Sequence, residues 1–235
     1  MSNNTQPAPN EKHFTANQLV RDIIIGMSDG LTVPFALAAG ISGITHSATI
    51  IIVGGLSEII AGSISMGIGG YLAAKSESEH FDAELAREYQ EIKELPEVEA
   101  KEVSDIFRSY GLKEEQIESI IATFQANPDA WIDFMMKNEL GLEKSEPKQA
   151  IKSALTVAIS YSLGGIIPLL PYMIISQNHQ ALLISAILTL IALFVFGYVK
   201  GSFIGNKPIK SGVSTMVIGG LAAGAAFALA SLISK

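Results

Sequence analysis

Residues 59–94 read IIAGSISMGIGGYLAAKSESEHFDAELAREYQEIKE, and the character of the chain changes within this segment at Lys75. Within this segment, residues 59–74 carry no charged side chain, whereas acidic residues recur at short intervals after Lys75. Apolar residues keep a helical spacing through the charged half, at Phe81, Leu85, Ile92 and Leu95. The sequence therefore predicts one long helix that leaves a membrane, continues into water and is interrupted at Pro96.

The acidic residues are concentrated in one window, residues 76–147. This window holds nineteen of the 23 acidic residues and seven basic ones, whereas the rest of the chain has four acidic and nine basic residues. The formal net charge of −7 therefore conceals two regions of opposite sign. We expect a soluble helical domain at 76–147, set within an apolar chain.

The apolar remainder contains enough uncharged sequence for five membrane spans, since one helix needs about 20 apolar residues to cross a bilayer. The polar segment from Ser42 to Ser47 predicts a turn that divides the first apolar region into two. The fold class expected is all-α, a polytopic membrane protein with spans at roughly 19–43, 47–75, 153–175, 181–199 and 211–234. The domains predicted are a disordered tail (1–16), spans one and two (17–75), the acidic domain (76–147) and spans three to five (148–235).

Basic residues near the ends of the spans predict the orientation of the chain. They precede span one, flank the acidic window and fill the loop after span four, whereas the loops after spans one and three have none. The residues concerned are Lys12, Arg21, Lys75, Lys148, Lys152, Lys200, Lys207 and Lys210. The N-terminus, the acidic domain and the last loop are therefore expected in the cytosol.

Two acidic residues, Asp29 and Glu58, fall within the predicted spans. A carboxylate near the bilayer centre costs about 2.5 to 3.5 kcal/mol, and the spans contain no basic residue that could neutralise these two. The hypothesis is that both line a cation or proton pathway. For Glu58 the alternative is a place near the membrane surface.

The neighbours of these acids suit a cation site. Gly26 and Gly30 flank Asp29 and permit a close helix contact. Met66 follows Glu58 by about two helical turns, so its thioether could join a transition-metal site, although a methionine in a span also packs without binding anything. Close helix contacts are expected at further glycines, namely Gly62, Gly67, Gly69, Gly70, Gly220 and Gly224.

The acidic domain offers a second candidate metal site. Pairs of glutamates at helical spacing, with two methionines close to another glutamate, combine carboxylate and thioether ligands and favour a transition metal such as Fe²⁺. The alternative for many of these acids is a solvated surface. The candidate ligands are Glu88, Glu91, Glu99, Glu102, Met135, Met136 and Glu139.

Several functional classes are not expected from this sequence. It contains no glycine-rich phosphate loop, catalytic triad or nucleotide motif, and no basic run suited to nucleic acid. Cysteine is absent, which excludes disulfides and thiolate metal sites. The chain is therefore not expected to be an enzyme or to hold a prosthetic group.

Three segments closely resemble the vacuolar iron transporter family: DIIIGMSDGLTVPFALAAG at 22–40, residues 58–75 with SMG at 65–67 and GYLAAK at 70–75, and WIDFMMKNELGLE at 131–143. The resemblance runs from about Asn17 to Lys235. It implies a five-span homodimer in membrane lipid that exports cytosolic Fe²⁺ in exchange for protons, with Mn²⁺, Zn²⁺ or Co²⁺ as further divalent substrates. A cytosolic helical metal-binding domain lies between spans two and three in that family.

The resemblance also assigns roles to residues. Asp29 and Met66 match ligands of the translocation path at the dimer interface, and Glu58 matches an acid in that path. All seven candidate ligands of the acidic domain match cytosolic metal-site positions. The membrane implied is the vacuolar membrane in a eukaryote or the inner membrane in a bacterium.

Two other interpretations remain open. A membrane-anchored metal buffer or sensor would use the acidic domain without moving metal, and Asp29 and Glu58 would then have no evident purpose. A transporter of another solute could use the acidic domain to dock a basic protein, and the segment 76–147 would then bind Fe²⁺ only weakly.

Overall fold

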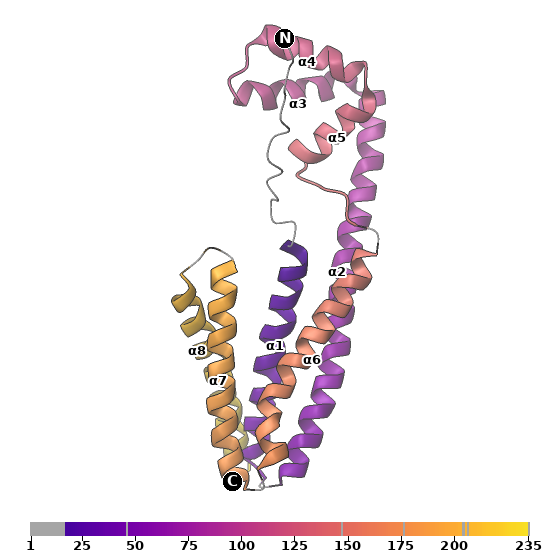
Figure 1. Ribbon diagram of the computed structural model, residues 1–235. Coiled ribbons are helices and arrows are strands. Elements are labelled where there is room, and N and C mark those ends of the chain that lie inside the picture. Colours follow the sequence, from indigo (N-terminus) through magenta and orange to yellow (C-terminus); the bar gives the residue numbers. More distant parts are fainter. Residues whose placement is uncertain are drawn as a thin grey trace, which may run out of the picture. The chain divides into compact units, whose positions relative to one another are not determined.

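The structure is a computed structural model that describes residues 17–45, 47–146, 148–175, 177–203, 205 and 207–234. These residues form eight α-helices and no β-strand (Figure 1). Five helices are long and apolar enough to cross a membrane, which confirms the predicted all-α fold with five spans. The predicted disordered tail, residues 1–16, lies outside the described residues.

The chain divides into two compact units. We call the first the membrane unit, Met1–Tyr71 with Ala150–Lys235, and the second the acidic unit, Leu72–Gln149. Helix α2 (Ala48–Glu94) belongs to both units, as expected for a helix whose apolar first half continues into a charged second half. The sequence placed the acidic domain at 76–147, and its cytosolic location stays a prediction.

The membrane unit contains α1 (Asn17–Ser42), the first half of α2, α6 (Gln149–Ile174), α7 (Asn178–Phe203) and α8 (Pro208–Ile233). Helix α1 ends at Ser42 and α2 begins at Ala48, so the predicted turn is confirmed. The four helices that belong wholly to the membrane unit, α1, α6, α7 and α8, each have an apolar segment of 25 or 26 residues. Such a segment is close to 40 Å long, which is enough to cross the hydrocarbon core.

Helices α1 and α6 touch through their backbones. A Cβ atom added at Gly30 would lie 2.8 Å from Tyr161 Cα, and one added at Gly164 would lie 2.9 Å from the backbone nitrogen of Leu31. Such distances leave no room for a side chain. Helix α2 meets α6 in the same way, because a Cβ at Gly62 would lie 2.5 Å from Tyr161 Cζ.

The predicted close contacts at glycines are confirmed in part. Gly67 and Gly70 of α2 face α6, where an added Cβ would lie 3.2 Å from the carbonyl oxygen of Ala154 and 3.1 Å from Val157, respectively. At Gly69 and Gly224 no such contact forms within this chain, since none of its atoms lies within 4 Å of a Cβ added there, and a contact with a second copy stays a prediction. Glycines on the outer face of a helix are not distinguished from packed ones by their spacing alone.

The remaining helices of the membrane unit complete its core. Helix α8 packs against α7 and α1. Phe35 and Ala39 of α1 join Ala223 of α8 in one buried cluster. A second cluster unites α1, α2, α6 and α7 around residues that include Ile51, Leu169 and Ala181.

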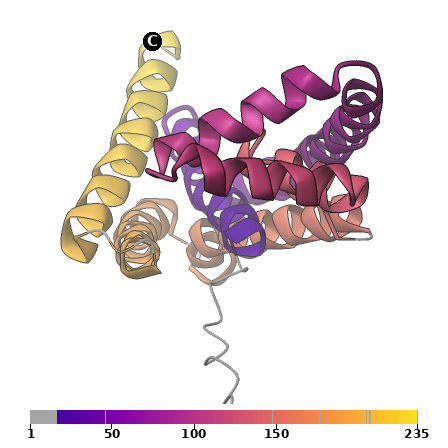
Figure 2. The ribbon, with the colours of Figure 1, turned by 90° about the horizontal axis from the view of Figure 1, so that it is seen from above.

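The acidic unit contains the second half of α2 with α3 (Pro96–Ser109), α4 (Glu114–Gln125) and α5 (Pro128–Asn138). Its helix boundaries coincide with local sequence signals, of which Pro96 was predicted. Pro96 occupies the first turn of α3, Gly111 follows that helix with a φ of 85°, and the Asn127 side chain accepts a hydrogen bond from Ala130 N at the start of α5. Figure 2 shows α3 and α4 lying alongside each other.

Two apolar clusters hold the acidic unit together. Phe81 of α2 packs with Ile132 and Met136 of α5, and Val103 of α3 packs with Trp131 and Met135. Leu95, the last residue of the predicted apolar spacing, does not join either cluster and is 51% exposed. Leu95 is the single residue between α2 and α3, so it no longer follows the helical period of α2.

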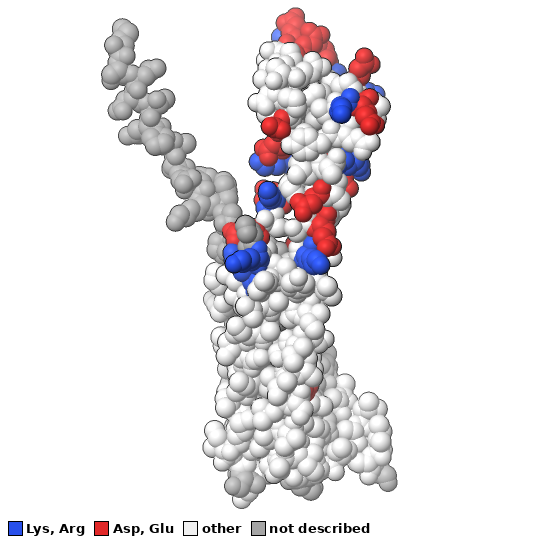
Figure 3. All heavy atoms as spheres, turned by 90° about the vertical axis from the view of Figure 1, so that its right-hand side faces the viewer, with Lys and Arg blue, Asp and Glu red and all other residues white. Residues whose placement is uncertain are grey.

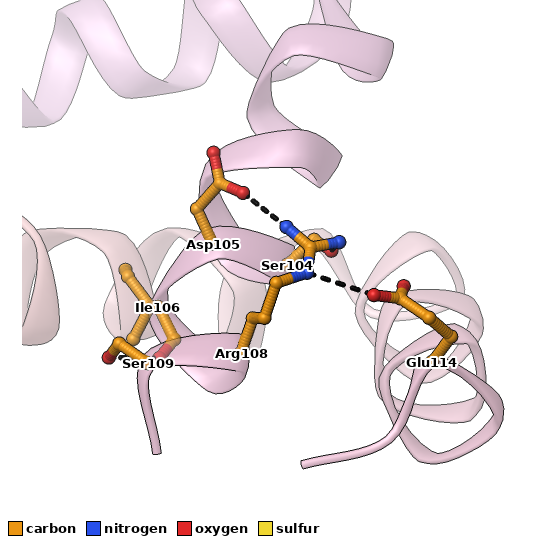
Figure 4. Close-up of polar contacts among 6 residues, drawn as sticks. All are labelled: Ser104, Asp105, Ile106, Arg108, Ser109 and Glu114. Atoms are coloured by element: carbon orange, nitrogen blue, oxygen red, sulfur yellow. Dashed lines mark hydrogen bonds and ion pairs between the residues drawn. The ribbon is translucent and has the colours of Figure 1, made fainter. Parts of the chain in front are cut away.

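An arginine joins α3 to α4 at the surface (Figure 4). Arg108 Nε donates to Glu114 Oε1 at 2.9 Å, and its Nη1 lies 2.5 Å from Asp105 Oδ1. The Nη2 atom donates to Ser104 Oγ at 3.0 Å. Exposed ion pairs contribute up to about 1 kcal/mol, so this group orients the turn more than it stabilises the unit.

The contact between α1 and α6 predicts the effect of a single methyl group. Gly30→Ala should destabilise the detergent-solubilised protein by about 1 to 3 kcal/mol, because the new Cβ overlaps the backbone of Tyr161. The matched control is Gly69→Ala, where a Cβ meets open space. Thermal unfolding should show a lower melting temperature for Gly30→Ala alone, and equal melting temperatures would contradict the backbone contact.

Candidate functional site

The predicted site residues fall into two groups, one in each unit. We call Asp29, Glu58 and Met66 the membrane site. We call Glu88, Glu91, Glu99, Glu102 and Glu139 the carboxylate cluster. Met135 and Met136, the other predicted ligands, lie in the acidic unit with this cluster.

Glu58 is held by a tyrosine of another helix. The Tyr161 hydroxyl of α6 donates a hydrogen bond to Glu58 Oε1 across the contact between α2 and α6. Tyr161 is only 2% exposed. The second carboxylate oxygen of Glu58, Oε2, is buried and has no hydrogen-bond partner among the described residues. Glu58 therefore has one oxygen oriented by the protein and one that a proton or a cation could bind.

Asp29 lies close to the same tyrosine. It is half-buried on α1, and its carboxylate is near enough to Tyr161 for an electrostatic interaction. The flanking Gly26 and Gly30 both face α6, so α1 approaches α6 directly beside the acid. The structure thus brings Asp29 and Glu58, which are on different helices, near the same tyrosine.

Met66 lies farther along α2 and is half-buried. It precedes Gly67, the residue through which α2 packs on Ala154 and Ala158 of α6. Two helical turns separate Met66 from Glu58, as the sequence indicated. Its part in a metal site stays a prediction.

The carboxylate cluster joins three helices of the acidic unit. Glu88 and Glu91 come from α2, Glu99 and Glu102 from α3, and Glu139 from the end of α5. Two members are buried, with Glu88 2% exposed and Glu99 3% exposed. One oxygen of each of these two has no hydrogen-bond partner within the described part of the chain.

Burial and mutual repulsion change how these acids ionise. Burial, followed by the charges of neighbouring glutamates, raises the pKa of Glu88 to about 7 and that of Glu99 to about 7. The pKa of Glu139 is raised by loss of its water shell, by the charges of Glu102 and Glu91 and by a hydrogen bond to Glu102. The cluster therefore retains protons near neutral pH unless a cation replaces them.

The side chains of the carboxylate cluster are of the type that binds a divalent cation, although they do not converge on one position. Among the described residues, no three His, Asp or Glu side chains are already placed to hold one metal ion. Like charges push carboxylates apart, so a cation would have to draw them together. Met135 and Met136 are buried in the two apolar clusters, and their role as ligands also stays a prediction.

Sequence reasoning missed Tyr161. It lies in a span that contains no acid, and its partner Glu58 is 103 residues away. Spacing within one helix cannot report a hydrogen bond between two helices. The signal available was a tyrosine in a span without charged residues, three residues before the pair Gly164 and Gly165.

The surface charges separate the two units. In the face drawn in Figure 3, acidic and basic side chains cover the acidic unit, whereas the apolar body of the membrane unit is nearly free of them. This distribution agrees with a membrane around the long apolar helices.

Comparisons with known proteins agree with one another. A family model described as "VIT family" matches residues 20–231. "Vacuolar iron transporter 1" of Arabidopsis thaliana is 55% identical over 95% of this chain and 89% of its own length. The Oryza sativa protein of the same name is 53% identical over 94% and 87%, respectively. "Protein CCC1" of Saccharomyces cerevisiae is 40% identical over 89% of this chain and 67% of its own length.

The raised pKa values of Glu88 and Glu99 predict a pH-dependent stability in the absence of metal. Their folded pKa values, about 7, exceed the ordinary value of 4.5, so this contribution to stability is full below pH 4.5 and is lost as the pH rises through 7. The acidic unit should be about 1 to 3 kcal/mol more stable at pH 5 than at pH 8. Urea unfolding followed by the fluorescence of Trp131, the single tryptophan, measures it.

The control for this experiment is the double variant Glu88→Gln, Glu99→Gln. Neutral side chains should remove most of the difference between pH 5 and pH 8. A difference that persists in the double variant would assign the pH dependence to other groups.

Proposed function

This chain belongs to the VIT family, and on that premise we propose that it carries Fe²⁺ out of the cytosol across a membrane in exchange for protons. The observation that supports this proposal best is the pair of acids in the membrane unit: Glu58 accepts a hydrogen bond from Tyr161, and Asp29 interacts electrostatically with the same residue. Acids that are costly to bury in a membrane are retained where they bind a cation or a proton.

The first step is capture of Fe²⁺ by the carboxylate cluster. Divalent iron binds carboxylates and tolerates the thioethers of Met135 and Met136, whereas Mg²⁺ and Ca²⁺ prefer oxygen ligands alone. Binding displaces the protons that Glu88 and Glu99 retain near pH 7. A rise in cytosolic pH therefore favours capture.

The second step is passage through the membrane site. Fe²⁺ exchanges water for the carboxylates of Asp29 and Glu58, with Met66 as an additional soft ligand. Tyr161 fixes Oε1 of Glu58, which leaves Oε2 to bind the ion or a proton. Protons that enter from the far side then displace the metal, and each pH unit across the membrane supplies about 1.4 kcal/mol per proton.

The remaining features of the proposal follow the family resemblance of the sequence. Two copies form a homodimer with the pathway at their interface, Mn²⁺ is a second substrate, and the protein resides in the vacuolar membrane with the acidic unit in the cytosol. The names of the plant relatives support iron as the substrate and the vacuole as the location. A membrane-anchored Fe²⁺ buffer or sensor is the alternative, because the carboxylate cluster lies wholly within the acidic unit.

Reconstituted protein tests transport directly. Proteoliposomes that contain an iron-quenched dye and a pH dye should show Fe²⁺ entry coupled to opposite proton flow, and an imposed proton gradient should accelerate it. Binding of Fe²⁺ without any flux would favour the buffer or sensor. Flux that is independent of the proton gradient would contradict exchange.

Variants of the membrane site should separate transport from capture. Asp29→Ala should lower the rate of Fe²⁺ transport at least tenfold, while Fe²⁺ binding to the carboxylate cluster is unchanged. Glu102→Ala should weaken binding and reduce transport only in part. Transport at the normal rate in Asp29→Ala would overturn the proposed pathway.

Two tyrosines of α6 provide a matched comparison. Tyr161→Phe removes the donor to Glu58 and should slow transport about tenfold or more, the loss expected when a buried charge-assisted hydrogen bond is removed. Tyr172→Phe removes a hydroxyl that lies 3.0 Å from Ser42 Oγ and contacts no acid, so it should transport normally. Equal rates for the two variants would deny Tyr161 a specific role.

A further inference from the structure

The carboxylate cluster already contacts a cation that belongs to the protein. Arg87 lies on α2, one turn before Glu91, and its Nε atom lies 3.2 Å from both carboxylate oxygens of Glu91. Its Nη1 atom lies 3.2 Å from Glu84 Oε2. Glu91 is a predicted metal ligand, whereas Glu84 is not.

The influence of Arg87 extends beyond Glu91. Its charge also acts on Glu88 and Glu139, where it opposes the repulsion among the acids. The guanidinium stays ionised at any relevant pH, so it cannot yield its place by losing a proton as a carboxylic acid does. Metal must displace it physically or share Glu91 with it.

We propose that Arg87 is a built-in competitor of the divalent cation. It pairs with both Glu91 and Glu84 when no metal is bound, and it keeps only the pair with Glu84 when metal takes the Glu91 carboxylate. This inference rests on the proposed binding of Fe²⁺ by the carboxylate cluster. Glu84 lies three residues before Arg87 on the same helix, within reach of the displaced guanidinium.

The strength of this competition follows from exposure. The Arg87 side chain is 57% exposed, and exposed ion pairs are weak. The competitor should therefore reduce metal affinity modestly without blocking the site. For a transporter a modest reduction is useful, because metal that is captured too tightly is not passed on.

The test is an anaerobic titration of Fe²⁺ into the detergent-solubilised full chain, in which calorimetry measures the binding affinity. Arg87→Gln should bind about two- to fivefold more tightly than the unchanged protein. Lys137→Gln is the matched control, since it removes one positive charge from the same unit but breaks a 2.9 Å pair with Asp133, outside the cluster. It should leave the affinity unchanged.

A double variant distinguishes the contact between Arg87 and Glu91 from the general effect of removing one positive charge. If Arg87 acts through Glu91, Arg87→Gln should give no gain in affinity when Glu91→Gln is already present. A gain that persists there, an equal gain from Lys137→Gln, or weaker binding by Arg87→Gln would each overturn the proposal. Melting followed by Trp131 fluorescence verifies that every variant is folded.

The outcome also separates this inference from the proposed function. If the unchanged protein does not bind Fe²⁺, both the capture step and the competition are overturned. If it binds Fe²⁺ and Arg87→Gln has no effect, only the competition is overturned, and proteoliposome flux remains the test of transport.

Discussion

The arrangement of the membrane unit depends on backbones that touch. Three helices meet at Tyr161, and Gly30 and Gly62 give it room because neither has a side chain. The phenol reaches Glu58 only because α2 comes this close to α6. Since Asp29 precedes Gly30, the same contact that packs α1 on α6 brings the second acid to the tyrosine. The close packing of α1 and α2 on α6 therefore also determines where the acids of the membrane site lie.

The acidic unit meets the opposite difficulty, since it must hold five carboxylates near one another against their repulsion. The apolar clusters on α5 provide the compensating free energy, with Trp131 and Met135 on one side and Ile132 and Met136 on the other. The methionines thus have a packing role whether or not their sulfur atoms bind metal. A cation that neutralises the acids should stabilise the unit as a whole.

The fold could be predicted to a large extent, because its signals are local. Run length identified the five spans, Pro96 marked the break between α2 and α3, and the continuous α2 followed from the helical period at Phe81. Contacts between helices left no such signal. The spacing of glycines suggested packing at Gly69, where no other part of this chain approaches. Neither Tyr161 nor the contact of Arg87 with Glu91 could be read from composition, since each depends on side-chain placement.

The two groups of acids share one property. A carboxylate oxygen has no hydrogen-bond donor among the described residues at Glu58 in one unit, and the same holds at Glu88 and Glu99 in the other. A buried carboxylate in this state gains free energy from a proton or from a divalent cation, so the two compete for it. In the proposed cycle, protons are therefore the competitor at both groups of acids. The direction of net metal movement would then be set by the proton gradient across the membrane and not by the affinity of either group.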